Sequence, residues 1–402
     1  MGKRVFVTGA GIISALGTGN DATLKALLEG KSGIGKITCI DTEHTEFPVG
    51  EVAMSNSEMS RILNVNYPVN GLRTVLLGIF AAREALVSAS LSPELLRSAA
   101  FISGTTVGGM DKTERHFKTV FDTNVETEDS LEMKFNDCGY STELIADSLG
   151  KFRMVTTSST ACSSAANAII LGANLIKAGI VDIAVVGGAE ALTKFHLNGF
   201  NTLMILDKEQ CRPFDKNRSG INLGEGAAYL VLESEKSAKS REVGIMAELS
   251  GYANTCDAFH QTATSENGEG AYKAMLKAME MARLTPADID YINAHGTGTP
   301  NNDETELAAM ERIWTDKLPL FSSTKSLTGH TTSASGSIES VICLLALQNG
   351  FVPGNSGWRT PIKENANPVV ENTPLPEIRN IINNSFGFGG NDSSIIFSKY
   401  IP

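Results

Sequence analysis

Cys162 occupies a position in the sequence that suits a catalytic nucleophile. It lies in a Ser/Thr-rich turn between an extended run and an alanine-rich, helix-forming run that ends at Gly179. A thiol at a helix start meets unpaired backbone N–H groups and the positive end of the helix dipole, so the position suits a nucleophile with a lowered pKa. A buried, unreactive cysteine is the alternative that this stretch alone leaves open.

Two histidines also follow predicted strands. His295 begins the run His-Gly-Thr-Gly-Thr directly after residues 289–294, and His330 follows Lys325 and Gly329 after a predicted strand at 321–325. Folds of the α/β class place their chemistry at strand ends, so both histidines are candidates for catalysis. Taken singly, each is more readily explained as a structural residue. No close pair of ligands has metal-binding spacing, so we predict no metal site.

The elements that must position these residues alternate between strand and helix along the whole chain. We predict helices at residues 21–29, 72–89, 235–241, 270–283 and 333–348, and strands that include 181–190 and 246–252. One unit occurs twice, around Cys162 and around His330: a strand, a polar turn, a reactive side chain and a helix of small residues. We therefore predict an α/β protein of two pseudo-equivalent halves, residues 1–241 and 242–402, which bring both turns to one site.

Composition excludes several classes of function. The 402 residues exceed one ordinary core, and 42% hydrophobic with 20% charged residues describe a soluble globular protein. The formal charge of −11 opposes nucleic-acid binding, and no segment is apolar enough to span a membrane. Six dispersed cysteines without paired spacing indicate reduced thiols in the cytoplasm. Gly9 and Gly11 suggest a dinucleotide loop, but Ser14 breaks its pattern.

Seven motifs occur together in a fixed order. They are Thr-Ala-Cys-Ser-Ser at 160–164, Val-Gly-Gly-Ala-Glu-Ala at 186–191, Cys-Arg-Pro-Phe-Asp at 211–215, Leu-Gly-Glu-Gly at 223–226, His-Gly-Thr-Gly-Thr at 295–299, Lys325 with Gly-His-Thr at 329–331, and Asn-Asn-Ser-Phe-Gly-Phe-Gly-Gly at 383–390. With these motifs the chain resembles, over essentially its whole length, the elongating β-ketoacyl-acyl carrier protein synthases, which are condensing enzymes. The resemblance implies the thiolase fold, with two pseudo-duplicated halves in a five-layer αβαβα arrangement.

The resemblance also implies a mechanism. Cys162 is the nucleophile that takes an acyl chain from a carrier-protein thioester. Decarboxylation of a malonyl thioester leaves an enolate, whose oxygen His295 and His330 stabilise as neutral N–H donors. The enolate attacks the acyl-Cys162 carbonyl, and the backbone N–H groups of Cys162 and Phe388 hold the resulting oxyanion.

Further residues match supporting positions of the family. The resemblance assigns charge balance and orientation of the second histidine to Lys325 and Glu339. It assigns binding of the phosphopantetheine arm to Thr297 and Thr299, a gating role to Phe388, and a place in the acyl pocket to Val107. The acidic pair that follows the glycine-rich run is taken as structural, and it consists of Asp303 and Glu306.

The resemblance implies partners as well. Substrates arrive on the phosphopantetheine of an acyl carrier protein, so no other cofactor is expected. A carrier protein is acidic and so is this chain, so docking needs a local basic patch, for which Arg61, Lys112, Arg115 and Lys118 are candidates. Scattered solubilising charges are an equally good explanation of these four residues. The family implies a homodimer, with a heterodimer as the alternative.

Two other functions remain open. A catalytically silent chain-length partner subunit would lack the nucleophile, and a thiolase-like acyl-CoA enzyme would carry a second cysteine near residues 386–390, where none occurs. The chain departs from the family at 151–155, which lacks Gly-Pro, at Ser219 and Ile221, and at Asp392. We expect these departures to alter the acyl pocket, and they leave open both fatty acid synthesis and specialised polyketide, aryl polyene or flexirubin-like pathways.

Overall fold

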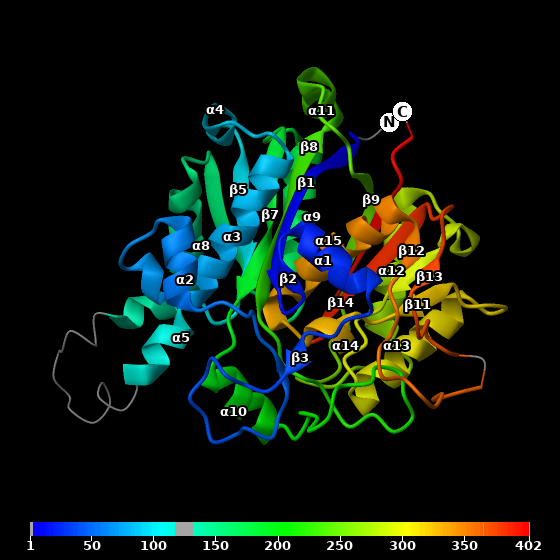
Figure 1. Cartoon of the computed structure of the whole chain (residues 1–402). Coiled ribbons are helices and arrows are strands. Elements are labelled where there is room, and N and C mark those ends of the chain that lie inside the picture. The colour runs from blue at the N-terminus through cyan, green and yellow to red at the C-terminus, as the bar shows by residue number, and fades with distance from the viewer. Residues whose placement is uncertain (1–2, 117–131, 365, 402) are drawn as a thin grey trace.

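A single twisted sheet runs through the whole molecule (Figure 1). The computed structural model describes residues 3–116, 132–364 and 366–401. Within them, eleven strands form one sheet in the order β11-β10-β14-β15-β9-β1-β8-β7-β5-β6, with β2 paired to β1. Their bounds are β1 (Val5–Ser14), β2 (Gly17–Thr18), β5 (Ala100–Gly104), β6 (Met154–Ser158), β7 (Ile183–Glu190), β8 (Gly226–Ser234), β9 (Ala247–Cys256), β10 (Tyr291–Asn293), β11 (Leu320–Ser322), β14 (Asn380–Gly387) and β15 (Asn391–Ser398).

The sheet repeats its pattern on either side of the β1/β9 junction. From β1 outward, the β8 and β7 pairings are antiparallel and the β5 and β6 pairings are parallel. From β9 outward, β15 and β14 pair antiparallel, and β10 and β11 pair parallel. The predicted pseudo-duplication is therefore present. The connection between the two sets of strands is helix α11 (Glu235–Arg241), at whose end the predicted boundary falls.

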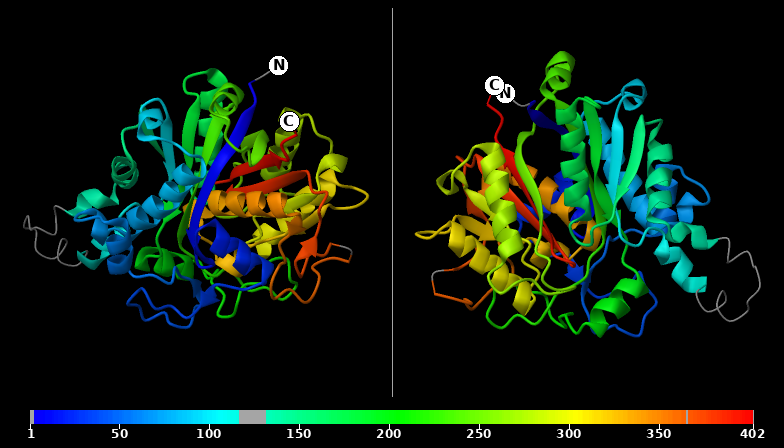
Figure 2. Two further views of the ribbon diagram at one scale, coloured as in Figure 1. Left: turned by 45° about the horizontal axis from the view of Figure 1, so that its top comes forward. Right: turned by 180° about the vertical axis from the view of Figure 1, so that it is seen from behind.

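Helices cover the sheet in three layers (Figure 2). The first half has α3 (Arg73–Ser88) and α8 (Cys138–Leu149) outside, and the second half has α12 (Glu269–Ala282) and α13 (Pro300–Ile313) outside. Between the halves lie α9 (Ser164–Ala178) and α15 (Ser335–Asn349), which pack on each other. Residues 335–347 of α15 are all buried, although the helix carries the polar residues Ser335, Ser337 and Glu339 among its apolar ones. The two halves of the sheet form two β layers that alternate with the three helix layers, which is the predicted five-layer αβαβα arrangement.

Most predicted elements agree with the structure within one or two residues, but the strand expected at 246–252 continues to Cys256 as β9, and the strand expected at 321–325 is shorter than predicted. It ends at Ser322, and Lys325 begins the short helix α14 (Lys325–Thr328). Besides short 3-10 helices, the described chain has further helices and strands. They are α1 (Asn20–Leu28), α2 (Asn56–Leu63), α4 (Pro93–Leu96), α5 (Met110–Thr113), α10 (Lys194–Thr202), β3 (Ile34–Gly35), β4 (Val49–Gly50), β12 (Phe351–Val352) and β13 (Thr373–Pro374).

None of the helices described here has the length and apolar character that crossing a bilayer requires. Among the described helices the longest, α3, has 16 residues, against about 20 for a span.

Candidate active site

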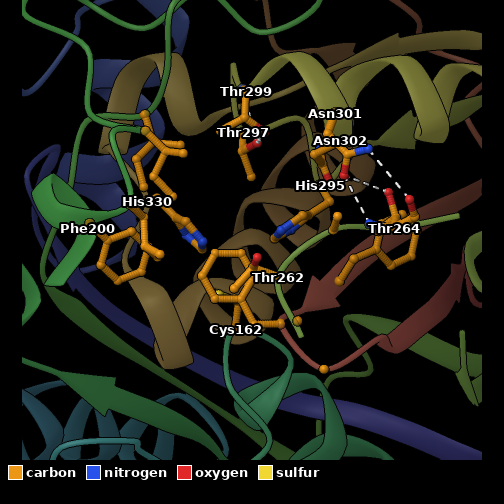
Figure 3. Close-up of a pocket in the computed structure, with 18 of the residues that line it drawn as sticks. Cys162, Phe200, Thr262, Thr264, His295, Thr297, Thr299, Asn301, Asn302 and His330 are labelled. Carbon is orange, nitrogen blue, oxygen red and sulfur yellow. Dashed lines mark hydrogen bonds between the residues drawn. The ribbon is translucent and has the colours of Figure 1, made fainter. Parts of the chain in front are cut away.

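The turns that follow several strands meet at one cavity of about 340 Å³. Cys162 lies between β6 and α9, His295 follows β10, His330 follows α14, and Phe388 lies in the turn between β14 and β15. All four line this cavity. Figure 3 shows the rings of His295 and His330 pointing toward one another, with Cys162 on the same cavity wall. The prediction that both halves contribute to one site is therefore correct.

The turn before Cys162 is tightly fixed. Ala161 has a positive φ of 52°, which is uncommon for a residue with a side chain and makes the sharp change of direction from strand to helix. Ser164 holds this turn, since its Oγ accepts from the Thr160 N–H (2.9 Å) and donates to the Ala161 carbonyl (2.6 Å). A Cβ at Gly387 would lie 2.9 Å from the Thr160 oxygen, so only glycine lets β14 approach the nucleophile so closely.

Cys162 is less acidic than its place in the chain suggests. It directly precedes the N-cap of α9, yet burial raises the pKa of its thiol to about 11. The Lys325 ammonium and hydrogen bonds from the backbone N–H groups of Phe388 and Cys162 oppose this rise without cancelling it. The expectation of a lowered pKa is therefore wrong, because only 6% of the residue is exposed and the cost of burying a thiolate exceeds the local electrostatic gain.

The two histidines form a neutral pair. Their ring centroids are 5.4 Å apart and their planes are inclined at 83°. Burial lowers the pKa of both His295 and His330 well below the usual range, and the Lys325 ammonium lowers it further. At neutral pH each ring therefore carries a single N–H, which it can donate to a developing negative charge.

Lys325 contacts the first histidine, His295. Its Nζ lies 2.6 Å from the His295 carbonyl oxygen and 3.3 Å from His295 Nδ1, and it forms an ion pair with Glu339 Oε1. An ammonium has three N–H donors and accepts nothing, so these three contacts make Nδ1 an acceptor and leave the proton on Nε2. The family resemblance predicts that Lys325 and Glu339 orient the second histidine, His330, but the contacts of Lys325 are with His295, and Lys325 acts on His330 through its charge. Strands β10 and β11 are adjacent and parallel. His295, which comes after β10, therefore lies close to Lys325, which comes after β11.

The acidic pair holds the glycine-rich loop in place. Glu306 accepts from the backbone N–H groups of His295 (2.9 Å) and Gly296 (2.8 Å), and burial raises its pKa to about 7. Asp303 accepts from the Gly298 N–H at 3.2 Å. Neither carboxylate lines the cavity. These contacts are what a structural role requires.

The cavity wall contains most of the predicted binding residues. Thr297 and Thr299 line it, and their hydroxyl oxygens are 2.8 Å apart. Phe388 stacks on Phe200, with ring centroids 5.9 Å apart. Val107 is buried but does not line this cavity, and its N–H donates to Glu190 (3.0 Å). Its place in an acyl pocket stays a prediction.

The sequence did not predict part of the cavity wall, and it indicated Ile221 only as a departure from the family. Phe200, Leu203 and Ile205 form an apolar side together with Ile221, the residue at which the chain departs from the family. A polar side that sequence motifs did not indicate consists of Thr262, Thr264, Asn301 and Asn302.

The other departures lie away from the cavity. Met154 and Val155 begin the edge strand β6 and are 40% and 38% exposed. Asp392 is buried on β15 opposite Phe386, and burial together with Asp257 and Glu306 raises its pKa to about 7. Of the three departures, only the one at Ile221 contacts this cavity directly.

The proposed docking cations differ in availability. Arg61 and Arg115 are exposed. Lys112 pairs with Glu132 at 2.7 Å and lies over the ring of Tyr67, so its charge is already matched. Lys118 lies outside the described residues.

Comparison with known proteins gives matches over the whole length. Residues 71–238 match the family described as "Beta-ketoacyl synthase, N-terminal domain", and residues 246–358 match its C-terminal domain. Nodulation protein E of Rhizobium meliloti (strain 1021) is 33% identical over 411 residues, which cover 99% of this chain and 100% of that protein. The 3-oxoacyl-[acyl-carrier-protein] synthase 2 of Staphylococcus aureus (strain COL) is 33% identical over 410 residues, 99% of each chain. A solved structure described as the ishigamide ketosynthase/chain length factor superposes with a TM-score of 0.93 at 33% identity, covering all of both chains.

Proposed function

The chain belongs to the β-ketoacyl synthase family of condensing acyltransferases, and from this we propose that it condenses malonyl-acyl carrier protein with an acyl chain held on Cys162. The product is a β-ketoacyl-acyl carrier protein, and the pathway is fatty acid or polyketide synthesis. The observation that supports this proposal most directly is the meeting of Cys162 with two neutral histidines in one cavity.

The residues divide the reaction between them. The Cys162 sulfur displaces the carrier thiol from an acyl thioester and becomes acylated. Malonyl thioester then loses CO₂, and the N–H groups of His295 and His330 stabilise the enolate oxygen as its charge develops. The enolate carbon attacks the acyl carbonyl, whose oxyanion accepts from the backbone N–H groups of Cys162 and Phe388. This attack forms the carbon–carbon bond, and collapse of the intermediate restores the carbonyl, breaks the carbon–sulfur bond and releases the Cys162 thiolate.

The cavity wall suits a carrier-bound substrate. The hydroxyl groups of Thr297 and Thr299, which line the cavity, offer hydrogen bonds to the amides of a phosphopantetheine arm, and we assign the gate between arm and acyl chain to Phe388, whose ring stacks on Phe200. Because the substrates bring their own thiol arm, we propose that the enzyme needs no cofactor or metal of its own.

A silent chain-length partner is the second candidate, because the ishigamide structure is described as a ketosynthase/chain length factor. The presence of Cys162, His295 and His330 in one cavity favours the catalytic role. Acyl loading followed by intact-mass measurement tests this. We expect an adduct on Cys162, its loss in Cys162→Ser, and its persistence in Cys343→Ala, which removes a thiol buried in the core. If no acyl carrier protein of a panel gave an adduct on the wild-type protein, the catalytic assignment would be refuted.

A second variant separates the two half-reactions. Cys162→Gln places an uncharged amide where the acyl thioester would sit. It should abolish condensation and keep malonyl decarboxylation, which depends on the histidines. His295→Ala or His330→Ala should show the reverse, with acylation of Cys162 retained and decarboxylation lost. Loss of decarboxylation in Cys162→Gln would contradict this division of labour.

Assembly can be proposed from the edge of the sheet. No strand in the described part of the chain pairs with the outer edge of β6, and Met154, Val155 and, on α9, Leu171 are exposed there. Open edges of this kind pair with other chains. We assign this edge to a second copy, giving a homodimer. Light scattering should show a dimer that Val155→Lys dissociates, whereas a monomer that dimerises only with a different family member would indicate a heterodimer.

The compartment follows from the cysteines. All six are unpaired, and two of them, Cys39 and Cys256, are exposed. Such thiols persist in a reducing compartment, so we propose a cytoplasmic location.

A further inference from the structure

The second histidine has a partner that no motif indicated. Nδ1 of His330 lies 2.9 Å from the hydroxyl oxygen of Ser335, the first residue of α15. Ser335 is 1% exposed, and its oxygen also lies 3.2 Å from the hydroxyl of Thr331. His295 has Lys325 at the equivalent nitrogen. Each histidine therefore has its own hydrogen-bonding partner at Nδ1.

The partner of Nδ1 decides what a neutral imidazole can do. The ring has one proton, so His330 donates into the cavity from Nε2 only if Nδ1 is an acceptor. A hydroxyl is able to donate or to accept, and the surroundings favour donation. Ser335 opens a helix of 15 residues, whose positive end faces Nδ1, and the Lys325 ammonium adds positive potential. Positive potential at Nδ1 favours its lone pair over a proton.

We propose that Ser335 is a positioning residue: its hydroxyl donates to Nδ1 of His330 and holds the Nε2–H toward the cavity. Thr331 extends this series of hydrogen bonds, because its hydroxyl donates to the Ser335 oxygen. The enolate oxygen then meets two imidazoles in the same tautomer, one fixed by an ammonium and the other by a hydroxyl. The catalytic consequence rests on the proposed function, whereas the tautomer itself does not.

The chain offers a matched control. Ser337 is a fully buried serine in the same helix, and its hydroxyl donates only locally, to the Ala334 carbonyl at 3.1 Å. In a Cys162→Gln background, Ser335→Ala should slow malonyl decarboxylation roughly 10- to 100-fold in kcat with little change in KM. Ser335→Thr should restore the rate, and Ser337→Ala should leave it unchanged. Acylation of an intact Cys162 should be unaffected by Ser335→Ala.

The tautomer can be read without any substrate. In protein labelled with ¹⁵N-histidine, the His330 signal, identified by its absence in His330→Gln, should report an unprotonated Nδ1 and a protonated Nε2. Ser335→Ala should populate both tautomers. A protonated Nδ1 in the wild type, or an equal loss of decarboxylation in Ser337→Ala, would overturn the inference. A wild type that never decarboxylates malonyl carrier would refute the proposed function instead, and the NMR signal would still decide the role of Ser335.

Discussion

Burial makes the reactivity of Cys162 a steep function of pH. Its pKa is raised to about 11, and below that pKa the thiolate fraction grows tenfold with each pH unit. Because the thiolate is the reactive species, alkylation by iodoacetamide should accelerate about 1000-fold between pH 7 and pH 10. A thiol with a pKa of about 7, such as a helix start can produce, would gain only about twofold over the same range.

Peptide mapping after timed alkylation measures this for each cysteine separately. The exposed thiol of Cys256 serves as an internal reference for the reagent. A labelling rate of Cys162 that levels off below pH 9 would refute the dominance of burial. Lys325→Met provides the second arm: removing the cation disfavours the thiolate, so labelling should slow at every pH. Faster labelling in that variant would contradict the electrostatic role of Lys325.

Three further substitutions test two positions of the site and the buried ion pair between Arg73 on α3 and Glu225. Glu306→Ala leaves the buried N–H groups of His295 and its neighbour without an acceptor, which costs about 1–3 kcal/mol for each group; a lowered Tm and slower decarboxylation should result, and an unchanged Tm would speak against the structural role. Ile221→Phe narrows the cavity, so KM for carrier-bound substrates should rise while iodoacetamide labelling stays the same; equal losses in both would indicate misfolding. Arg73→Met leaves the fully buried carboxylate of Glu225 without its cation, so the free energy of unfolding measured in urea should fall by about 3–5 kcal/mol. A fall of less than about 1 kcal/mol would contradict a stabilising role of this ion pair.

The placement of the reactive residues could be predicted from the sequence. Cys162 and His295 each come after a strand, His330 comes after the short helix α14 that follows β11, and each belongs to a polar or glycine-rich turn. Parallel strands end at a common edge of the sheet. The repeated unit predicts that the turns after the strands of both halves meet at one site. Local patterns therefore carry enough information to find the nucleophile and both histidines.

Interactions that depend on tertiary neighbours could not be predicted in the same way. Lys325 is five residues from His330 in sequence, but the pairing of β10 with β11 places it at His295. The helix dipole at Cys162 is a local feature, whereas its burial depends on the whole fold. Ser335 looks like an ordinary residue at a helix start until the turn after α14 brings His330 to it.

The two halves also share one hydrophobic core. The largest cluster joins Val5 and Ile169 of the first half to Ile342 and Phe397 of the second. Such halves cannot swing apart about a hinge, because opening would expose that core to water. Entry of a long tethered substrate must therefore rely on small movements at the cavity mouth. Phe388 is suited to this, since Gly389 and Gly390, both with positive φ, follow it directly. We therefore predict that substrate enters by a turn of the Phe388 ring, without a separation of the two halves.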